Sequence, residues 1–212
     1  MDMEHNENLT PETEAKKKSD PVRELYSSLR DLCIILAAVT VIFVFVVRLV
    51  GVSGSSMFPT LVNRDYMLLL SNFVSDDYEQ GDIVVATIPS FSKDPIVKRV
   101  IAVEGQTVDI DYTTGTVYVD GTALEEPYIC EQGWDLSYAE ATELPAVVPE
   151  GCYFLMGDNR NHSADSRYAR IGMVPGKRIM GRVLLIGLPG KQTDLNGNVI
   201  GGRDFSRMGA PE

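Results

Sequence analysis

An uncharged apolar run near the amino terminus constrains this 212-residue chain more than any other feature. The run LCIILAAVTVIFVFVV, Leu32 to Val47, is sixteen residues long, and only Thr40 interrupts its apolar surface. Continued through Arg48 to Val52 it reaches 21 residues, roughly 31 Å as a helix at about 1.5 Å per residue. The hydrocarbon core of a bilayer is about 30 Å thick. The run therefore predicts a membrane-spanning helix, with Arg48 reaching the interface.

Two other interpretations of the run are a buried core helix and a cleaved signal peptide. A core helix is expected to carry a polar stripe at helical spacing, which this segment lacks. A signal peptide usually begins with a short basic region, whereas 31 residues with eight acidic side chains precede this run. Both comparisons favour a helix that is retained in the membrane.

The charges that flank the run predict its orientation. Only Arg48 and Arg64 lie within about 20 residues beyond its apolar core, a distance over which flanking charge matters. Five basic residues precede it: Lys16, Lys17, Lys18, Arg23 and Arg30. Basic flanks stay on the cytoplasmic side. We therefore expect a single-pass protein of the cell membrane, with a cytoplasmic amino terminus and an external remainder.

Composition excludes several classes of function. The net charge of −11 argues against nucleic-acid binding, which depends on basic side chains. The three cysteines, Cys33, Cys130 and Cys152, form no CxxC pair, and the only histidines are His5 and His162. Neither set has the spacing of metal ligands. We expect no metal and no cofactor, and whether Cys130 and Cys152 pair stays open.

Short β-type segments fill the chain beyond the apolar run. VDIDYTTGTVYVDG, residues 108–121, alternates apolar and polar residues on both sides of a turn, which predicts a hairpin. No comparable helical period appears outside the membrane span, so the fold is predicted to be mainly antiparallel β. The predicted organisation has four parts: a disordered cytoplasmic tail at 1–31, the transmembrane helix at 32–52, an external β domain at 53–190 and a flexible tail at 191–212.

The segment VSGSSMFPTL, residues 52–61, offers three hydroxyl groups, on Ser53, Ser55 and Ser56. Gly54 supplies a tight turn, and a proline fixes the chain direction three residues after Ser56. A serine nucleophile also needs a base within hydrogen-bond reach. Because His5 lies in the predicted cytoplasmic tail, His162 is the sole external histidine, and lysine is the other possible base.

Lys98 is the lysine whose surroundings best suit a base. A lysine can accept a proton near neutral pH only if its pKa falls from about 10.4 toward 8, which requires burial in apolar surroundings. Lys98 lies inside the β-branched run PIVKRVIAV, whereas the other external lysines lie in polar turns. Taken alone, the run also fits an edge strand that points Lys98 into solvent.

Three motifs downstream of the apolar run resemble those of the type I signal peptidases, which are membrane-anchored serine proteases with a Ser-Lys dyad. The motifs are GSSMFPTL, KRVIAVEG and GDNRNHSADSR, in this order, and the resemblance covers residues 32 to about 188. It implies an antiparallel β catalytic domain of the signal peptidase type. The implied partners are membrane lipid and secretory preproteins, cut after an A-x-A-like site.

The resemblance also implies roles for individual residues. Ser56, directly before Met57, matches the nucleophile, and Lys98 matches the general base. In the third motif, Ser163 and Asp165 match residues that hold the lysine and its surroundings in place, and Arg167 matches the partner of that aspartate. The groove for the substrate is expected to be lined by Val50, Val52, Met57, Ile96 and Val97.

Two positions depart from the family pattern. Some members carry a serine two residues before the nucleophile whose hydroxyl contributes to the oxyanion hole, but this chain has Gly54 there, next to the substrate. The oxyanion is then expected to rest on backbone amides, including that of Ser56. His162, beside Ser163, is interpreted as a solvated loop residue.

Two alternative functions compete with a signal peptidase, one of them also an enzyme and the other of a different class. A self-cleaving Ser-Lys protease of the repressor type shares the dyad, but those proteins are soluble and this chain has an apolar span. A membrane-anchored module that binds peptides without cutting them would keep the groove, although the presence of both Ser56 and Lys98 argues against it. Only a cleavage assay separates this last alternative from a peptidase.

Overall fold

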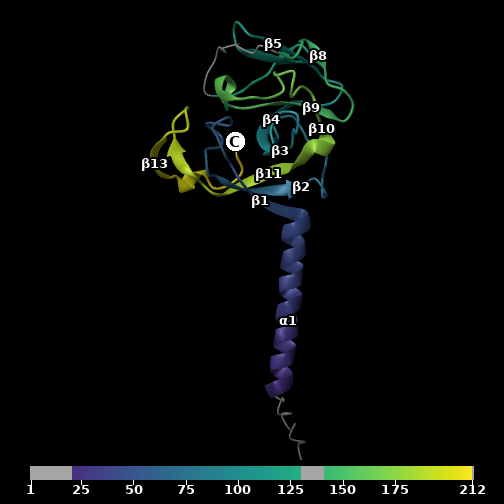
Figure 1. Ribbon diagram of the computed structural model, residues 1–212, viewed down its shortest axis with the longest axis vertical. Coiled ribbons are helices and arrows are strands. Elements are labelled where there is room, and N and C mark those ends of the chain that lie inside the picture. Colours follow the sequence, from purple (N-terminus) through teal and green to yellow (C-terminus); the bar gives the residue numbers. More distant parts are fainter. Residues whose placement is uncertain (1–20, 130–140, 212) are drawn as a thin grey trace, which may run out of the picture. The chain divides into compact units, whose positions relative to one another are not determined.

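The structure, a computed structural model, describes residues 21–129 and 141–211 (Figure 1). The chain divides into two compact units, with the boundary between Thr40 and Val41. All strands of the described residues belong to the second unit. Cys130 and most of the predicted cytoplasmic tail lie outside the described residues.

The apolar run forms the predicted helix. Helix α1 spans Pro21–Val41, and a π-helical turn, η1, continues it over Ile42–Val46. The stretch Pro21–Val46 is long and apolar enough to cross a membrane, and none of its residues is buried against protein. This exposure argues against a core helix.

The predicted helix bounds, 32–52, are wrong at both ends. Pro21 suits a helix start, because the first turn leaves its N–H groups unbonded and proline has none, so the helix replaces the last third of the predicted tail. At the other end, Val47–Gly51 form strand β1, whose backbone pairs with strand β2, Tyr66–Ser71. Tertiary pairing thus overrides the apolar periodicity at Val47–Gly51.

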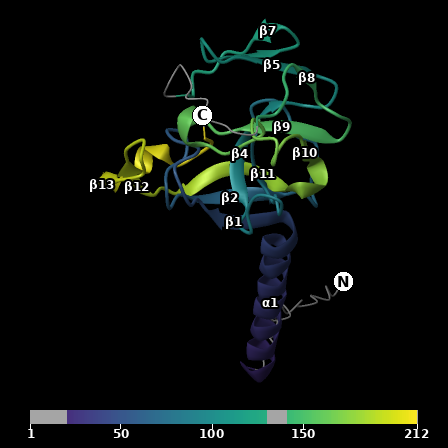
Figure 2. The same cartoon turned by 45° about the horizontal axis from the view of Figure 1, so that its top comes forward.

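A seven-stranded sheet forms the main layer of the β unit (Figures 1 and 2). Its strand order is β1-β2-β11-β3-β4-β9-β10, and every neighbouring pair is antiparallel. Besides β1 and β2 it contains β3 (Ile83–Ala86), β4 (Ile96–Ala102), β9 (Cys152–Met156), β10 (Val174–Pro175) and β11 (Ile179–Leu188). The mainly antiparallel β fold is confirmed, and β4 lies inside the sheet, so Lys98 is not on an edge strand.

A second, four-stranded sheet lies beyond the main one in Figure 2 and has the order β7-β6-β5-β8. It consists of β5 (Thr107–Asp111), β6 (Thr116–Val119), β7 (Thr122–Ala123) and β8 (Ala146–Val147). Strands β5 and β6 are the predicted hairpin. In its turn the Asp111 carboxylate accepts hydrogen bonds from the Thr113 N–H and the Thr114 hydroxyl, at 2.8 and 2.9 Å.

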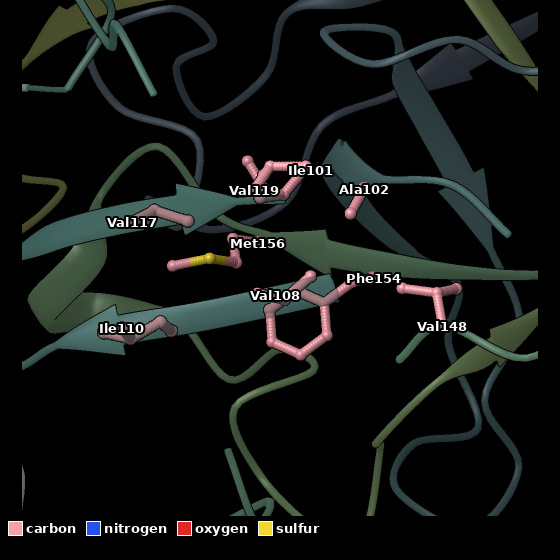
Figure 3. Close-up of a cluster of buried hydrophobic side chains, with 9 residues drawn as sticks. All are labelled: Ile101, Ala102, Val108, Ile110, Val117, Val119, Val148, Phe154 and Met156. Carbon is pink, nitrogen blue, oxygen red and sulfur yellow. The ribbon is translucent and has the colours of Figure 1, made fainter. Parts of the chain in front are cut away.

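The main hydrophobic cluster joins the two sheets. Phe154 and Met156 of β9 extend toward the side chains of β5 and β6 (Figure 3). The buried members of the cluster are Ile101, Ala102, Val108, Ile110, Val117, Val119, Val148, Phe154 and Met156. A second cluster lies beneath the serine motif and includes Val52, Met57, Leu61, Met67 and Val85. Packing on both sides explains why β4 is buried from Lys98 to Ala102.

Residues 191–211 of the predicted flexible tail instead form regular structure. Strands β12 (Lys191–Thr193) and β13 (Val199–Arg203) pair, and a short 3₁₀ turn, η4, follows at Phe205–Arg207. The Gly209 backbone exchanges two hydrogen bonds with Ile186 of β11, at 2.7 and 3.2 Å. This segment lacks an aliphatic run, so its order depends on contacts with distant residues.

Candidate active site

The serine motif lies on the loop that joins β1 to β2, residues 52–65. Two backbone hydrogen bonds close the base of this loop: Val52 N–H to Asp65 O at 2.8 Å and Arg64 N–H to Val52 O at 2.9 Å. Gly54 has a φ of +103°, a backbone conformation that other residues adopt only with strain. Met57 is buried in the core directly after Ser56, so the loop holds Ser56 beside a fixed side chain.

Ser56 and Lys98 lie in direct contact. The Lys98 Nζ atom, in the middle of the main sheet, is 2.7 Å from Ser56 Oγ and donates a second hydrogen bond to the Val97 carbonyl oxygen at 2.9 Å. Lys98 is only 3% exposed, which excludes the interpretation as a solvent-facing lysine. The arrangement brings a hydroxyl and an amine within proton-transfer distance.

Burial lowers the pKa of Lys98 from its usual 10.5 to about 8. Desolvation is the largest cause, because an ammonium ion loses its hydration in this environment. The carboxylates of Asp165 and Asp158 act in the opposite direction, and the Arg167 guanidinium lowers the pKa further. A large fraction of Lys98 is therefore neutral at mildly alkaline pH.

The three predicted supporting residues form one buried cluster centred on Asp165. Arg167 donates two hydrogen bonds to its carboxylate, from Nε at 2.8 Å and from Nη2 at 2.9 Å. Ser163 Oγ donates at 2.7 Å and the Gly157 N–H at 3.0 Å. Burial raises the pKa of Asp165, but Arg167 and these hydrogen bonds outweigh it and hold the pKa below its usual value. Asp165 is therefore a charged, fully bonded carboxylate.

Gly157 fills the space between this cluster and the serine. A Cβ atom at Gly157 would lie 2.2 Å from Ser163 Oγ and 2.4 Å from the Ser56 carbonyl oxygen. No side chain fits at these distances, so glycine is required where the chain leaves β9 and passes between the two groups.

A second buried ion pair, which the sequence analysis assigned no role, lies next to Lys98. Arg99 donates two hydrogen bonds to Asp158, at 2.9 and 2.7 Å, and stacks over the Tyr128 ring at 3.9 Å. Thr60, from the serine loop, donates its hydroxyl to the same carboxylate at 2.5 Å. Arg99 lies in the second motif, Asp158 in the third and Thr60 in the first. Their contact arises only in the folded chain, so the sequence did not indicate it.

Asn159 is a further residue missed by the sequence analysis. Its backbone N–H donates to the Ser56 carbonyl oxygen at 3.1 Å, and its side-chain Nδ2 donates to the Ser55 carbonyl oxygen at 3.1 Å. It therefore fixes the main chain on both sides of the Ser56 amide. The asparagine lies within GDNRNHSADSR, yet the motif alone does not indicate which backbone atoms it bonds.

A pocket with a volume of about 320 Å³ opens beside Ser56 and Lys98. Five of the six residues predicted to contact substrate line it: Val50, Val52, Met57, Ile96 and Val97. Gly54 does not line it. The lining also includes Gly51, Ser53, Val85, Asp94 and Pro95, which were not predicted for this role.

The remaining candidates lie apart from this arrangement. His162 is exposed on a short 3₁₀ turn, η2, at Arg160–His162. Cys152 is a free thiol, and its possible partner Cys130 lies outside the described residues. Within residues 21–129 and 141–211, no three His, Cys, Asp or Glu side chains are grouped as metal ligands.

Comparison with known proteins gives one consistent result. The family model for signal peptidase, peptidase S26, matches residues 25–192. A signal peptidase I of Bacillus amyloliquefaciens and signal peptidase I T of Bacillus subtilis (strain 168) are each 32% identical over 198 residues, covering 88% of this chain and 96% of theirs. A crystallised signal peptidase I from Enterococcus faecalis V583 is 29% identical, with a TM-score of 0.39 over 50% of this chain and 96% of that one.

The close approach at Gly157 gives a first prediction. Gly157→Ala forces its methyl group against Ser163 and the Ser56 carbonyl oxygen, so we expect a loss of about 1–3 kcal/mol in the free energy of unfolding. We also expect hydrolytic activity to fall, because the displaced atom belongs to the residue that contacts Lys98. Denaturant unfolding and a peptide-cleavage assay measure the two effects.

Gly202→Ala is the matched control, because a Cβ there meets no atom within 4 Å. We expect this variant to keep both stability and activity. A Gly157→Ala protein as stable and as active as Gly202→Ala would contradict the packing described here.

Proposed function

The chain belongs to the signal peptidase, peptidase S26, family of serine peptidases that remove signal peptides, and from that premise we propose that Ser56 and Lys98 are its catalytic dyad. The proposed substrates are secretory preproteins, cut after an A-x-A-like site. One observation carries the proposal: the Lys98 amine, buried and with a pKa of about 8, lies 2.7 Å from the Ser56 hydroxyl.

In the first half of the proposed reaction, neutral Lys98 accepts the proton of Ser56 Oγ. The oxygen then attacks the carbonyl carbon of the scissile peptide bond and forms a tetrahedral intermediate. Protonated Lys98 gives its proton to the nitrogen of the leaving chain, which is the amino terminus of the mature protein. The signal peptide stays attached to Ser56 as an ester.

In the second half, water replaces the leaving amine. Lys98, neutral again, takes a proton from this water, and the resulting hydroxide attacks the ester carbonyl. Collapse of the second intermediate returns the proton to Ser56 Oγ and releases the signal peptide. One lysine therefore serves both steps, and Asp165 and Arg167 act as supporting groups that maintain the charge balance around it.

The oxyanion of both intermediates is proposed to rest on backbone amides. The Ser56 N–H donates no hydrogen bond within the described part of the chain, so it is free to bind a developing negative charge. Gly54 has no hydroxyl to contribute. Its φ of +103° also disfavours the serine that some family members carry at this position. The bonds from Asn159 to the flanking carbonyl groups keep the Ser56 amide in position.

The pocket beside the dyad fits an extended peptide with small side chains. One wall comes from edge strand β1 and its extension, Val50–Val52, and the other from Asp94–Val97 at the start of β4. Alternate side chains of an extended peptide point the same way, so the first and third residues before the scissile bond face these walls together. Aliphatic walls reject large side chains by overlap, and the same walls shield Lys98 from water.

We further propose that Pro21–Val46 anchors the enzyme in the cell membrane, with the catalytic unit outside. Basic residues are concentrated before the apolar core of this helix, which favours a cytoplasmic amino terminus. The catalytic unit then lies on the outer side of the membrane, where translocated preproteins emerge. Membrane lipid is then the second partner of the chain.

The dyad is tested by two substitutions in the full-length protein. Ser56→Ala removes the nucleophile and should lower cleavage of a preprotein by roughly 10³-fold or more. Lys98→Arg keeps the positive charge but cannot offer a neutral nitrogen, because a guanidinium stays protonated, and should be equally inactive. Turnover of a purified preprotein with an Ala-x-Ala site, followed by gel electrophoresis, measures both.

Ser55→Ala is the matched control, since it removes a neighbouring hydroxyl from the same loop. We expect it to retain most of the activity. Preprotein processing that survived in Ser56→Ala would refute the nucleophile, and processing that survived in Lys98→Arg would refute the base.

The proposed topology predicts a protection pattern. Protease added to intact spheroplasts should digest the unit beyond Val52 and spare a tag fused to the amino terminus, because only the former lies outside. Permeabilised spheroplasts serve as the control, in which both parts are digested. Digestion of the amino-terminal tag in intact spheroplasts would reverse the orientation.

A further inference from the structure

We propose that the carboxyl-terminal segment, residues 191–211, braces the loop that carries Ser56, and that Arg207 is its main positioning residue. This inference rests on the proposed role of Ser56 as nucleophile. The segment lies far from the serine motif in the sequence, but it contacts the loop 52–65 directly at Thr60 and Asp65, and it reaches Ser55 indirectly through Asn159.

The first contact is an ion pair at the end of the loop. Arg207 donates two hydrogen bonds to the fully buried Asp65 carboxylate, from Nη2 at 2.8 Å and from Nη1 at 3.2 Å. Its Nη2 also donates to the Thr60 carbonyl oxygen at 2.8 Å. One guanidinium therefore ties two points of the loop together, five residues apart in the sequence.

Asp65 extends this contact into the rest of the fold. Its carboxylate accepts hydrogen bonds from the Val62 N–H at 2.8 Å, inside the loop, and from the Gly190 N–H at 2.6 Å, just before β12. Its carbonyl oxygen accepts from Val52 N–H, which closes the loop. Removing Arg207 leaves the buried Asp65 carboxylate without its cationic partner. An unpaired buried charge is costly, so Asp65 is expected to shift toward solvent or to admit water.

The second contact lies beside the nucleophile. Asn159 Nδ2, which donates to the Ser55 carbonyl oxygen, also donates at 3.3 Å to the carbonyl oxygen of Leu195, between β12 and β13. Hydrogen bonds close the adjoining turn, where the Asp194 carboxylate accepts from the Asn196 and Asn198 N–H groups, at 3.0 and 2.8 Å. The hairpin thus supports the asparagine that fixes the backbone around Ser56.

The loop needs such support because the sheet holds it from one side only. Strand β1, which leads into the loop, is the edge strand and pairs with β2 alone. A loop opens more readily than the core, even where buried Met57 and the hydrogen bond from Thr60 to Asp158 already tie it there. Displacement of a reacting group by about 1 Å costs as much as 10²-fold in rate, so the brace bears directly on the contact between Ser56 and Lys98.

The brace should influence catalysis and substrate binding differently. Two groove residues of the loop, Val52 and Met57, are buried in the core and so keep their place. The groove residues on β4, Ile96 and Val97, have no hydrogen bond to the carboxyl-terminal segment within the described residues. Loss of Arg207 should therefore lower kcat by about 10- to 100-fold and change KM by less than about threefold. A merely structural residue would lower the amount of active enzyme and the melting temperature without loosening the loop selectively.

The test compares Arg207→Ala, Arg207→Lys and a matched control, Arg178→Ala, in the full-length protein in detergent micelles. Arg178 is exposed, and its side chain has no hydrogen bond or ion pair among the described residues. The readouts are kcat and KM on a preprotein, together with amide hydrogen exchange measured by mass spectrometry. In Arg207→Ala we expect exchange in residues 56–65 to quicken about 10-fold or more, with β3, β4 and β9 unchanged. Arg207→Lys, which keeps one charge but not the two-pronged geometry, should give intermediate values.

Two results separate failure of the brace from failure of the proposed function. If Arg207→Ala and Arg207→Lys match Arg178→Ala in kcat and in loop exchange, while Ser56→Ala is inactive, the brace is wrong and the dyad stands. If Ser56→Ala stays active, the dyad is wrong, and hydrogen exchange alone still decides whether Arg207 holds the loop.

Discussion

The burial of one amine, that of Lys98, is the constraint on which the rest of the site depends. An ammonium ion in this position would lose its hydration, whereas a neutral amine needs only the hydrogen bonds that it makes with the Val97 carbonyl oxygen and Ser56 Oγ. A central strand of a two-layer β fold provides such a place, because its side chains are covered from both faces. The fold therefore prepares the proposed base, and the serine loop only has to reach it.

Two Asp-Arg pairs set the charge around this amine. Unpaired, the carboxylates of Asp165 and Asp158 would attract a proton to Lys98 and keep it charged. Arg167 binds the first carboxylate and Arg99 the second, each with two hydrogen bonds. Asp165 also accepts a hydrogen bond from the N–H of Gly157, which lies close to the Ser56 carbonyl oxygen. Asp158 accepts one from the hydroxyl of Thr60, on the serine loop. Electrostatic balance and positioning are thus properties of the same groups.

Local sequence patterns predicted the parts of this site that depend on local structure. The apolar run, the β segments, the 108–121 hairpin and an apolar setting for Lys98 all follow from periodicity and composition. The helix bounds and the order of residues 191–211 do not, because both depend on partners elsewhere: β2 for Val47–Gly51 and Asp65 for Arg207. Asn159 was missed for a related reason, since its bonds are to backbone atoms that any residue would offer.

The central claim, a lysine made neutral by burial, is tested most directly by titrating Lys98 itself. The full-length protein, labelled with ¹³C at the lysine Cε position and held in micelles, gives one resonance that disappears in Lys98→Met and so belongs to Lys98. Below its midpoint the amine is charged and cannot accept the Ser56 proton, so activity should rise with pH through the same value. We expect a midpoint at about 8. A midpoint near the value of a solvated lysine, about 10.4, would contradict the account.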